Sequence, residues 1–357
     1  MRYFGNFSIL LPVFFLLTSC MSTQVNDNLN LGNEFAKDGL YREAVNAYKK
    51  ELKTNPENAH VRRNLGVVYV KMGSYVKAIK NLEISIKALP KNFQTNYFLA
   101  ESYRATNQFD KAIYRYKNAL EIRPLDFDAT KALAWSYYKI KYYSASMATI
   151  SSLPEKTRFH PQSTIIKARI LIKQRNLRSA KRIITKLIRS KREAYRPFAK
   201  SILGDIFQLE DQLELAKTTY NDALKVRPYL AGALLGLGKI YNKEGNFKVS
   251  RKYLERAVKI RPSLNEGYLE LAKAYEKSNP SRSVAFYRDF IRMSVNDPEF
   301  SDNIPYSKNR IANISARIRQ QKTRKNLGVG QGRNLNYGFQ NNPSKRFKEK
   351  DRRVISR

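Results

Sequence analysis

Apolar and small residues recur along this 357-residue chain with a period of 34 residues. Each period holds a leucine, a glycine or alanine, an aromatic residue three positions later, a second aromatic residue and an alanine. One example is the set Leu65, Gly66, Tyr69, Tyr75 and Ala78. The pattern predicts two helices that approach closely where the small residues face each other. A proline closes each well-formed period, at Pro56, Pro90, Pro124, Pro228 and Pro262.

Two irregular periods are expected between Pro124 and Pro228, because these prolines are separated by 104 residues, which is three periods plus two. One begins near Phe127, and its second helix is expected to be short because Pro154 follows. The other begins near Pro161. One unit alone cannot bury its apolar face, so stacking of neighbouring units must supply the core.

The best-formed periods closely resemble the tetratricopeptide repeat. They include GVVYVKMGSYVKAIKNLEISIKALP from Gly66 and GKIYNKEGNFKVSRKYLERAVKIRP from Gly238. The resemblance implies an all-α fold, a right-handed solenoid of helix-turn-helix repeats. We expect about eight units over residues 28–307, with the last one imperfect, a basic capping helix over 308–325, and a disordered basic tail over 326–357.

The amino terminus predicts export and lipid attachment. Arg2 precedes an apolar run from Phe4 to Leu17, which is about the length of a secretory leader and short for a membrane span. The next residues, LTSC ending at Cys20, resemble the lipobox of bacterial lipoproteins. This implies a signal peptide at 1–19 and a lipidated Cys20 followed by a short linker to residue 27. The alternative is an uncleaved anchor or an ordinary secreted leader.

Met21 follows the cysteine where an aspartate would retain such proteins at the inner membrane in enterobacteria. The resemblance therefore implies lipid anchoring at the outer membrane, on its periplasmic face.

The formal net charge of +37 raises the question of an anionic partner. Thirteen Lys or Arg residues and no acidic residue lie between Lys156 and Arg192. Nucleic acid is the usual partner of so basic a chain, but an exported protein meets little of it. Anionic lipid, cell-wall carboxylates or acidic proteins are the expected contacts, and a general drift of surface composition is the alternative explanation of the excess.

No constellation for catalysis is apparent in the sequence. A single cysteine and the distant His60 and His160 give no metal site of the usual Cys/His kind. The carboxylates lie among lysines and arginines at spacings typical of a solvated helix face. We therefore expect a protein that is not an enzyme and has no cofactor.

In tetratricopeptide proteins the partner commonly lies in the groove lined by the first helix of each unit. Trp135 is the only tryptophan, and an aromatic residue among basic ones is the composition of a binding hot spot; core packing is the alternative. The carboxylate clamp of chaperone-binding relatives is not expected, although Asn33 and Asn64 match it. The groove candidates are Arg63, Tyr97, Arg104, Lys131, Trp135, Tyr138, Arg169 and Lys173, with Lys139 beside them.

These features together resemble pilotin-type lipoproteins, which help a secretin to assemble in the outer membrane for type IV or tight-adherence pili. The resemblance implies a scaffold whose partner is a secretin or pilus component. The alternative is an accessory protein that recruits or regulates cell-wall enzymes, or binds glycan strands through the basic middle units.

Overall fold

The computed structural model describes residues 28–326, and every regular element in that range is a helix. Eight helix pairs follow one another from residue 28 to Ser294. The first helices of the pairs are residues 28–37, α3 (Ala59–Lys71), α5 (Phe93–Ala105), α7 (Phe127–Lys139), α10 (Pro161–Lys173), α12 (Arg196–Leu209), α14 (Ala231–Lys243) and α16 (Asn265–Tyr275). The second helices are α2 (Tyr41–Thr54), α4 (Tyr75–Ala88), α6 (Phe109–Ile122), α8 (Tyr143–Ser151), α11 (Leu177–Arg189), α13 (Leu213–Val226), α15 (Phe247–Ile260) and α17 (Pro280–Ser294).

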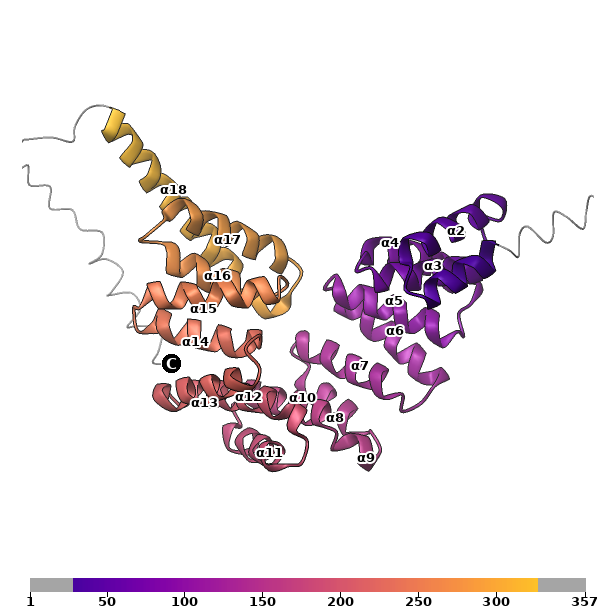
Figure 1. Ribbon diagram of the computed structural model, residues 1–357, viewed down its shortest axis with the longest axis horizontal. Helices are drawn as coiled ribbons and strands as arrows, with labels where there is room; N and C mark the ends of the chain where they lie inside the picture. The colour runs from indigo at the N-terminus through magenta and orange to yellow at the C-terminus, as the bar shows by residue number, and fades with distance from the viewer. Residues whose placement is uncertain (1–27, 327–357) are drawn as a thin grey trace, which may run out of the picture.

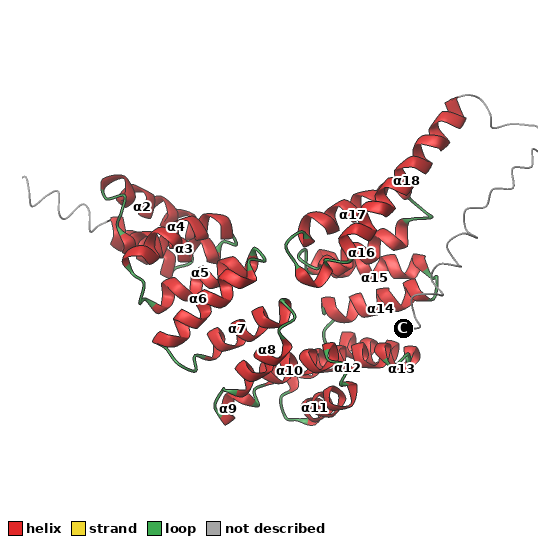
Figure 2. Ribbon diagram, turned by 180° about the vertical axis from the view of Figure 1, so that it is seen from behind, coloured by secondary structure: helices red, strands yellow, loops and turns green. Residues whose placement is uncertain are grey.

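The pairs stack in chain order into an open arc (Figure 1). The helices up to α6 form one arm, α7 to α11 form the base, and α12 to α18 form the other arm. Each first helix from α3 onward contacts the first helix of the next pair, so these helices form a continuous layer. Figure 2 shows the same arc from behind, with helices joined only by loops in the described range. The all-α solenoid expected from the 34-residue period is therefore confirmed.

Small residues let the two helices of every pair approach closely. On the second helix the facing position is fully buried in each pair; its residues are Ala44, Ala78, Ala112, Ser146, Ala180, Ala216, Ser250 and Ser283. Where it is serine, the hydroxyl donates to a carbonyl of the partner helix, as from Ser146 to Ala134 at 2.6 Å and from Ser250 to Gly238 at 2.8 Å. A side chain that reaches a neighbouring backbone in this way requires backbones in close contact.

A large side chain one turn further along the second helix covers the small residue of the first helix. A Cβ added to Gly204 would lie 2.5 Å from the Tyr220 ring, and one added to Gly66 would lie 2.5 Å from Leu82. The Tyr220 ring also lies against Gly236 of the next pair. Tyr220 therefore joins two successive repeats, and it is fully buried.

In seven of the eight pairs, the turn between the two helices uses a left-handed residue. Gly39, Gly73 and Gly245 have φ of +78°, +70° and +75° there. In four other pairs a non-glycine residue takes the same conformation; these are Asn107, Lys141, Arg175 and Asp211, at φ between 58° and 66°. The turn geometry is thus kept where the glycine is lost, at a cost of about 1 kcal/mol for each such residue.

The irregular fourth pair has a second helix, α8, of only nine residues. A four-residue helix, α9 (Glu155–Arg158), follows it and leads to Pro161 at the start of α10. The Asp126 side chain caps α7 by accepting the Ala129 amide at 2.9 Å, and the His160 Nδ1 accepts the Gln162 amide before α10. These caps fix the two first helices at the base of the arc.

After the eighth pair a short helix, η2 (Pro298–Phe300), leads into α18 (Asn303–Asn326). Ile314 of α18 is fully buried against α17, and Arg310 pairs with Glu276, the residue directly after α16. The long helix begins at residue 303 rather than at the expected residue 308, and its apolar residues cover the open end of the last pair. The leader at 1–19, the linker at 20–27 with Cys20, and residues 327–357 lie outside the described range.

No helix within residues 28–326 combines the length and the apolar character needed to cross a bilayer.

A methyl group at Gly236 is expected to destabilise the stack, because its Cβ would occupy the space of the Tyr220 ring. Overpacking should cost Gly236→Ala about 1–3 kcal/mol, and the gain of ~1 kcal/mol in helix propensity leaves a net loss of up to about 2 kcal/mol in the free energy of unfolding. The matched control is Gly232→Ala in the same helix, whose Cβ meets only the Ser201 hydroxyl at 3.2 Å. Urea unfolding should separate the two variants; equal stability would contradict this packing account.

Candidate partner-binding surface

Buried tyrosines of the second helices hold polar side chains on the layer of first helices. The Tyr48 hydroxyl donates to Asn33 at 2.7 Å, and Tyr220 donates to Asp205 at 2.7 Å. Tyr116 makes the equivalent short bond to Glu101. In each case the acceptor lies fifteen residues before the tyrosine. The repeat therefore sets the orientation of side chains along the inner face of the arc.

The expected groove residues of the first arm are held by contacts to neighbouring side chains. Tyr97 on α5 stacks on Phe93 with ring centroids 5.7 Å apart and meets Tyr116 edge-on at 6.1 Å. Arg104 donates to Glu101 at 2.6 Å. Burial, with the nearby Glu101 charge, raises the pKa of Tyr97.

Arg63 on α3 is half-buried and donates from Nε to the Asn64 side chain at 3.0 Å. The Asn64 amide in turn donates to Asn33 at 2.8 Å. The two asparagines that matched the chaperone-type clamp are thus bonded to each other, far from the base of the arc.

The other five expected residues lie on two neighbouring first helices at the base of the arc, α7 and α10. Trp135 is half-buried and stacks on Tyr138, with ring centroids 4.9 Å apart at 21°. Tyr138 is buried, and its burial and the nearby Glu299 charge raise its pKa. Lys131 at the start of α7 bridges to Gln162 of α10 at 2.8 Å. Trp135 thus packs partly in the core and is partly exposed at the surface, so its position agrees in part with core packing and in part with a binding hot spot.

A segment from the far end of the chain lies against these two helices. Lys139, the last residue of α7, donates to Asp297 at 2.7 Å and to Glu299 at 2.8 Å. Lys173, the last residue of α10, donates to Glu299 at 2.9 Å. We call these four residues the clasp. It connects the base of the arc to the loop between α17 and α18, which approaches the end of α7 in Figure 1.

Three of the four clasp side chains are largely withdrawn from water, and the fourth, that of Lys173, is 39% exposed. The side chains of Lys139 and Asp297 are only 11% and 4% exposed, and that of Glu299 is 29% exposed. Burial alone would raise the pKa of Glu299, but the ion pairs with Lys139 and Lys173 outweigh it and hold this pKa at about 2. Phe300 adds an aromatic contact, with its ring centroid 5.6 Å from Lys139 Nζ. Removing one partner of an ion pair this deeply buried leaves an uncompensated charge, which costs far more than the loss of an exposed pair.

Arg169, one turn before Lys173 on α10, completes the positive group on this face. It is half-buried, and its charge acts on Asp205 of α12 and on Tyr138. Burial raises the pKa of Asp205, and Arg169 and the Tyr220 hydroxyl partly offset that shift. The clasp region thus brings together Tyr138, Lys139, Arg169 and Lys173 from two helices.

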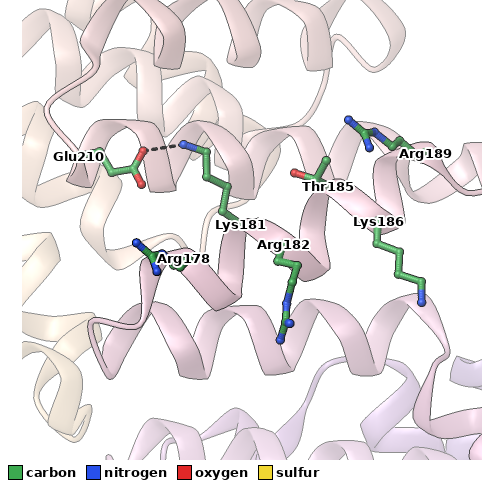
Figure 3. A pocket seen from close by; sticks show the side chains of 7 residues that line it. All are labelled: Arg178, Lys181, Arg182, Thr185, Lys186, Arg189 and Glu210. Carbon is green, nitrogen blue, oxygen red and sulfur yellow. Dashed lines mark hydrogen bonds and ion pairs between the residues drawn. The ribbon is translucent and has the colours of Figure 1, made fainter.

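The acid-free run forms a second surface, on the outer side of the arc. Ala180, Ile184 and Leu187 of α11 are buried. The opposite face of α11 carries exposed Arg178, Arg182, Lys186 and Arg189 around a shallow hollow (Figure 3). Lys181 pairs across the hollow with Glu210 at 2.9 Å. This face has the chemistry to contact an anionic surface, but it shows no enclosed site.

Sequence reasoning missed Asp297 and Glu299. The expectation that carboxylates lie on solvated helix faces is wrong for several residues, including Asp297 at 5% exposed and Glu51 at 1%. The only local signal at Asp297 was the Asp-Pro pair, which indicates a turn and no distant partner. Within residues 28–326, no group of three or more His, Cys, Asp or Glu residues is placed to hold a metal ion.

Models of known families match three parts of the chain. A model described as TPR repeat matches residues 32–73, and two described as tetratricopeptide repeat match residues 97–130 and 231–264. No curated protein matches the sequence.

Solved structures with a similar fold include a tetratricopeptide repeat protein from Parabacteroides merdae. It has a TM-score of 0.64 and 15% identity, and the match covers 71% of this chain and 99% of that one. The Cut9–Hcn1 hetero-tetramer of the APC/C matches with a TM-score of 0.47 and 15% identity, over 75% of this chain and 52% of that one. At 15% identity the likeness to the Parabacteroides merdae protein concerns the fold alone.

Lowering the pH should weaken the clasp, because protonation of Glu299 removes the charge that pairs with Lys139 and Lys173. Because its folded pKa of about 2 lies below the ordinary value of 4.5, its contribution to stability is complete above pH 4.5 and is lost as the pH falls towards 2. This shift corresponds to about 3 kcal/mol. Between pH 5 and 2, the unfolding free energy of the wild type should therefore fall further than that of Glu299→Gln.

The control for this measurement is Asp289→Asn, which removes a carboxylate of α17 that pairs only with Arg292 on its own helix. It should keep the pH dependence of the wild type. An identical acid response in the wild type and in Glu299→Gln would contradict the assignment of Glu299 to a buried ion pair.

Proposed function

We propose that this tetratricopeptide repeat protein is a non-catalytic scaffold of the bacterial cell envelope that binds another protein on the inner face of its arc. Tetratricopeptide repeats support a protein–protein interaction scaffold in general. The observation that carries the proposal is the group of Tyr138, Lys139, Arg169 and Lys173 at the base of the arc, where two helices converge on carboxylates. Rigid helices present these side chains, so little ordering is needed when a partner binds.

The proposed location is the periplasmic face of the outer membrane, with Cys20 as the site of lipid attachment. The support is the lipobox-like LTSC and the apolar leader before it. Between Cys20 and the first described helical residue, Asn28, seven residues remain, which reach at most ~25 Å. The arc would therefore work close to the lipid surface.

The proposed partner is a component of an envelope assembly, such as a secretin or pilus protein. This rests on the resemblance to pilotin-type lipoproteins, which combine a lipobox, a short linker and a run of such repeats. Basic side chains would steer an acidic partner towards the arc and fix its orientation.

The outer face of α11 favours a second candidate role, as an accessory protein at the cell wall. Four exposed cationic side chains, Arg178, Arg182, Lys186 and Arg189, line its hollow, and the one acidic residue there, Glu210, is paired with Lys181. Cell-wall carboxylates or anionic lipid head groups would suit this face through charge alone. In this role the inner face would recruit a cell-wall enzyme rather than a pilus component.

The test is capture of partners from detergent-solubilised envelopes by the full-length lipidated protein. The variant Arg169→Glu with Lys173→Glu reverses two charges at the base of the inner face and should lose the partner. The matched control, Lys252→Glu with Lys259→Glu, reverses two exposed charges on the second helix α15 and should keep it. Circular dichroism should verify that both variants remain helical.

Recovery of a secretin or pilus component that only the inner-face variant loses would support the proposal. Cell-wall enzymes recovered in the same pattern would favour the second role, and equal recovery by all forms would refute binding at the inner face. The same cells test the anchor, because Cys20→Ser should move the protein from the membrane fraction to the soluble fraction. Unchanged membrane retention of that variant would contradict lipid attachment at Cys20.

A further inference from the structure

The segment Asp297–Phe300 lies against helices from which it is separated by more than 120 residues of chain. It belongs to the connection between α17 and α18, where the Phe300 ring packs on Phe290 with centroids 5.6 Å apart. Its two carboxylates instead point to Lys139 and Lys173. Among residues 29–324, the side-chain hydrogen bonds between residues more than 40 positions apart all belong to this clasp.

The contacts of the segment have the form of peptide recognition. Lys139 Nζ lies between the carboxylates of Asp297 and Glu299, and the second ammonium group, from Lys173, holds Glu299 alone. The Phe300 ring lies 5.6 Å from Lys139 Nζ. Asp297 also accepts the Glu299 amide at 3.1 Å, which keeps the segment in a tight turn. Lys139 and Lys173, on adjacent first helices, therefore bind two carboxylates that are separated by one residue, and an aromatic ring follows the second carboxylate.

We propose that Asp297–Phe300 is an internal occupant of the partner site, and that the partner presents an acidic peptide of the same chemistry which displaces it. This inference rests on the proposed function, since it names the kind of segment that the inner face binds. The partner segment would carry two acidic residues at positions i and i+2 with an aromatic residue next. Its arrival would release the clasp and open the connection between the base and the second arm.

An occupant on the same chain competes strongly, because its effective concentration is in the millimolar range. In most molecules the site is therefore already occupied when a peptide arrives from solution. The apparent affinity of the peptide is its intrinsic affinity multiplied by the fraction of molecules in which the site is open. Neutralising Asp297 and Glu299 removes the charges that hold the segment and leaves Lys139 and Lys173 in place. The opened chain should then bind the peptide more tightly than the wild type does.

The experiment measures binding of a fluorescently labelled peptide, VNDPEFS, which copies residues 295–301, to the purified full-length chain. Asp297→Asn with Glu299→Gln should bind it at least about tenfold more tightly than the wild type. Adding Lys139→Met and Lys173→Met to that variant should abolish the gain, and the neutral peptide VNNPQFS should not bind. The matched control, Asp289→Asn with Asp302→Asn, removes two acidic residues on either side of the segment and should behave as the wild type.

Equal binding of VNDPEFS to the wild type and to the opened chain would overturn the proposal, and so would no binding to the opened chain. Each chain is also checked by circular dichroism and thermal unfolding. Loss of the helical fold in Asp297→Asn with Glu299→Gln would show that the segment is a permanent strap, which also overturns the proposal.

The two proposals can fail separately. If the charge-reversed inner face loses its captured partner but the opened chain binds no VNDPEFS, the scaffold function stands and the internal occupant does not. If the opened chain binds VNDPEFS through Lys139 and Lys173 but no partner depends on the inner face, the peptide site stands and the scaffold function does not.

Discussion

The close contact between the two helices of each pair is the constraint on which the rest of this structure depends. A glycine or alanine of the first helix faces an alanine or serine of the second, and both are buried throughout the described range. Only with backbones this close can Tyr220 reach across to Gly204 and Gly236 and join one pair to the next. A helix pair by itself leaves an apolar face exposed, so this joining is what makes the stack stable.

The same packing produces the inner face. The large residue over the small contact is a tyrosine in four pairs. Its hydroxyl donates to a polar side chain on the first helix in three of them, and to Glu276, directly after the first helix, in the last pair. These bonds fix the rotation of the first helices about their own axes, so that their other polar side chains lie on the inner face of the arc. At the base of the arc that surface holds Lys139, Arg169 and Lys173, and an acidic segment of the chain already lies against two of them.

The sequence predicted the fold and the helices that carry the candidate site, because both repeat every 34 residues. It also located the irregular fourth pair, since Pro154 and Pro161 leave no room for a helix of normal length. The clasp could not be predicted. Its lysines lie 126 to 160 positions from the carboxylates that they bind, and the two meet only because small rotations between successive pairs add up along the arc. Asp297 and Glu299 also lie in a connection that has no place in the repeat, so no periodic pattern indicates them.

Zero-length carbodiimide cross-linking of the free full-length protein tests most directly whether the inner face is occupied by its own chain. The reagent joins an amine to a carboxylate only where the two are in contact, and mass spectrometry identifies the joined peptides. The account predicts a link from Lys139 or Lys173 to the peptide that contains Asp297 and Glu299. Absence of that link, while the neighbouring pairs Lys181–Glu210 and Lys239–Glu266 are joined, would contradict it.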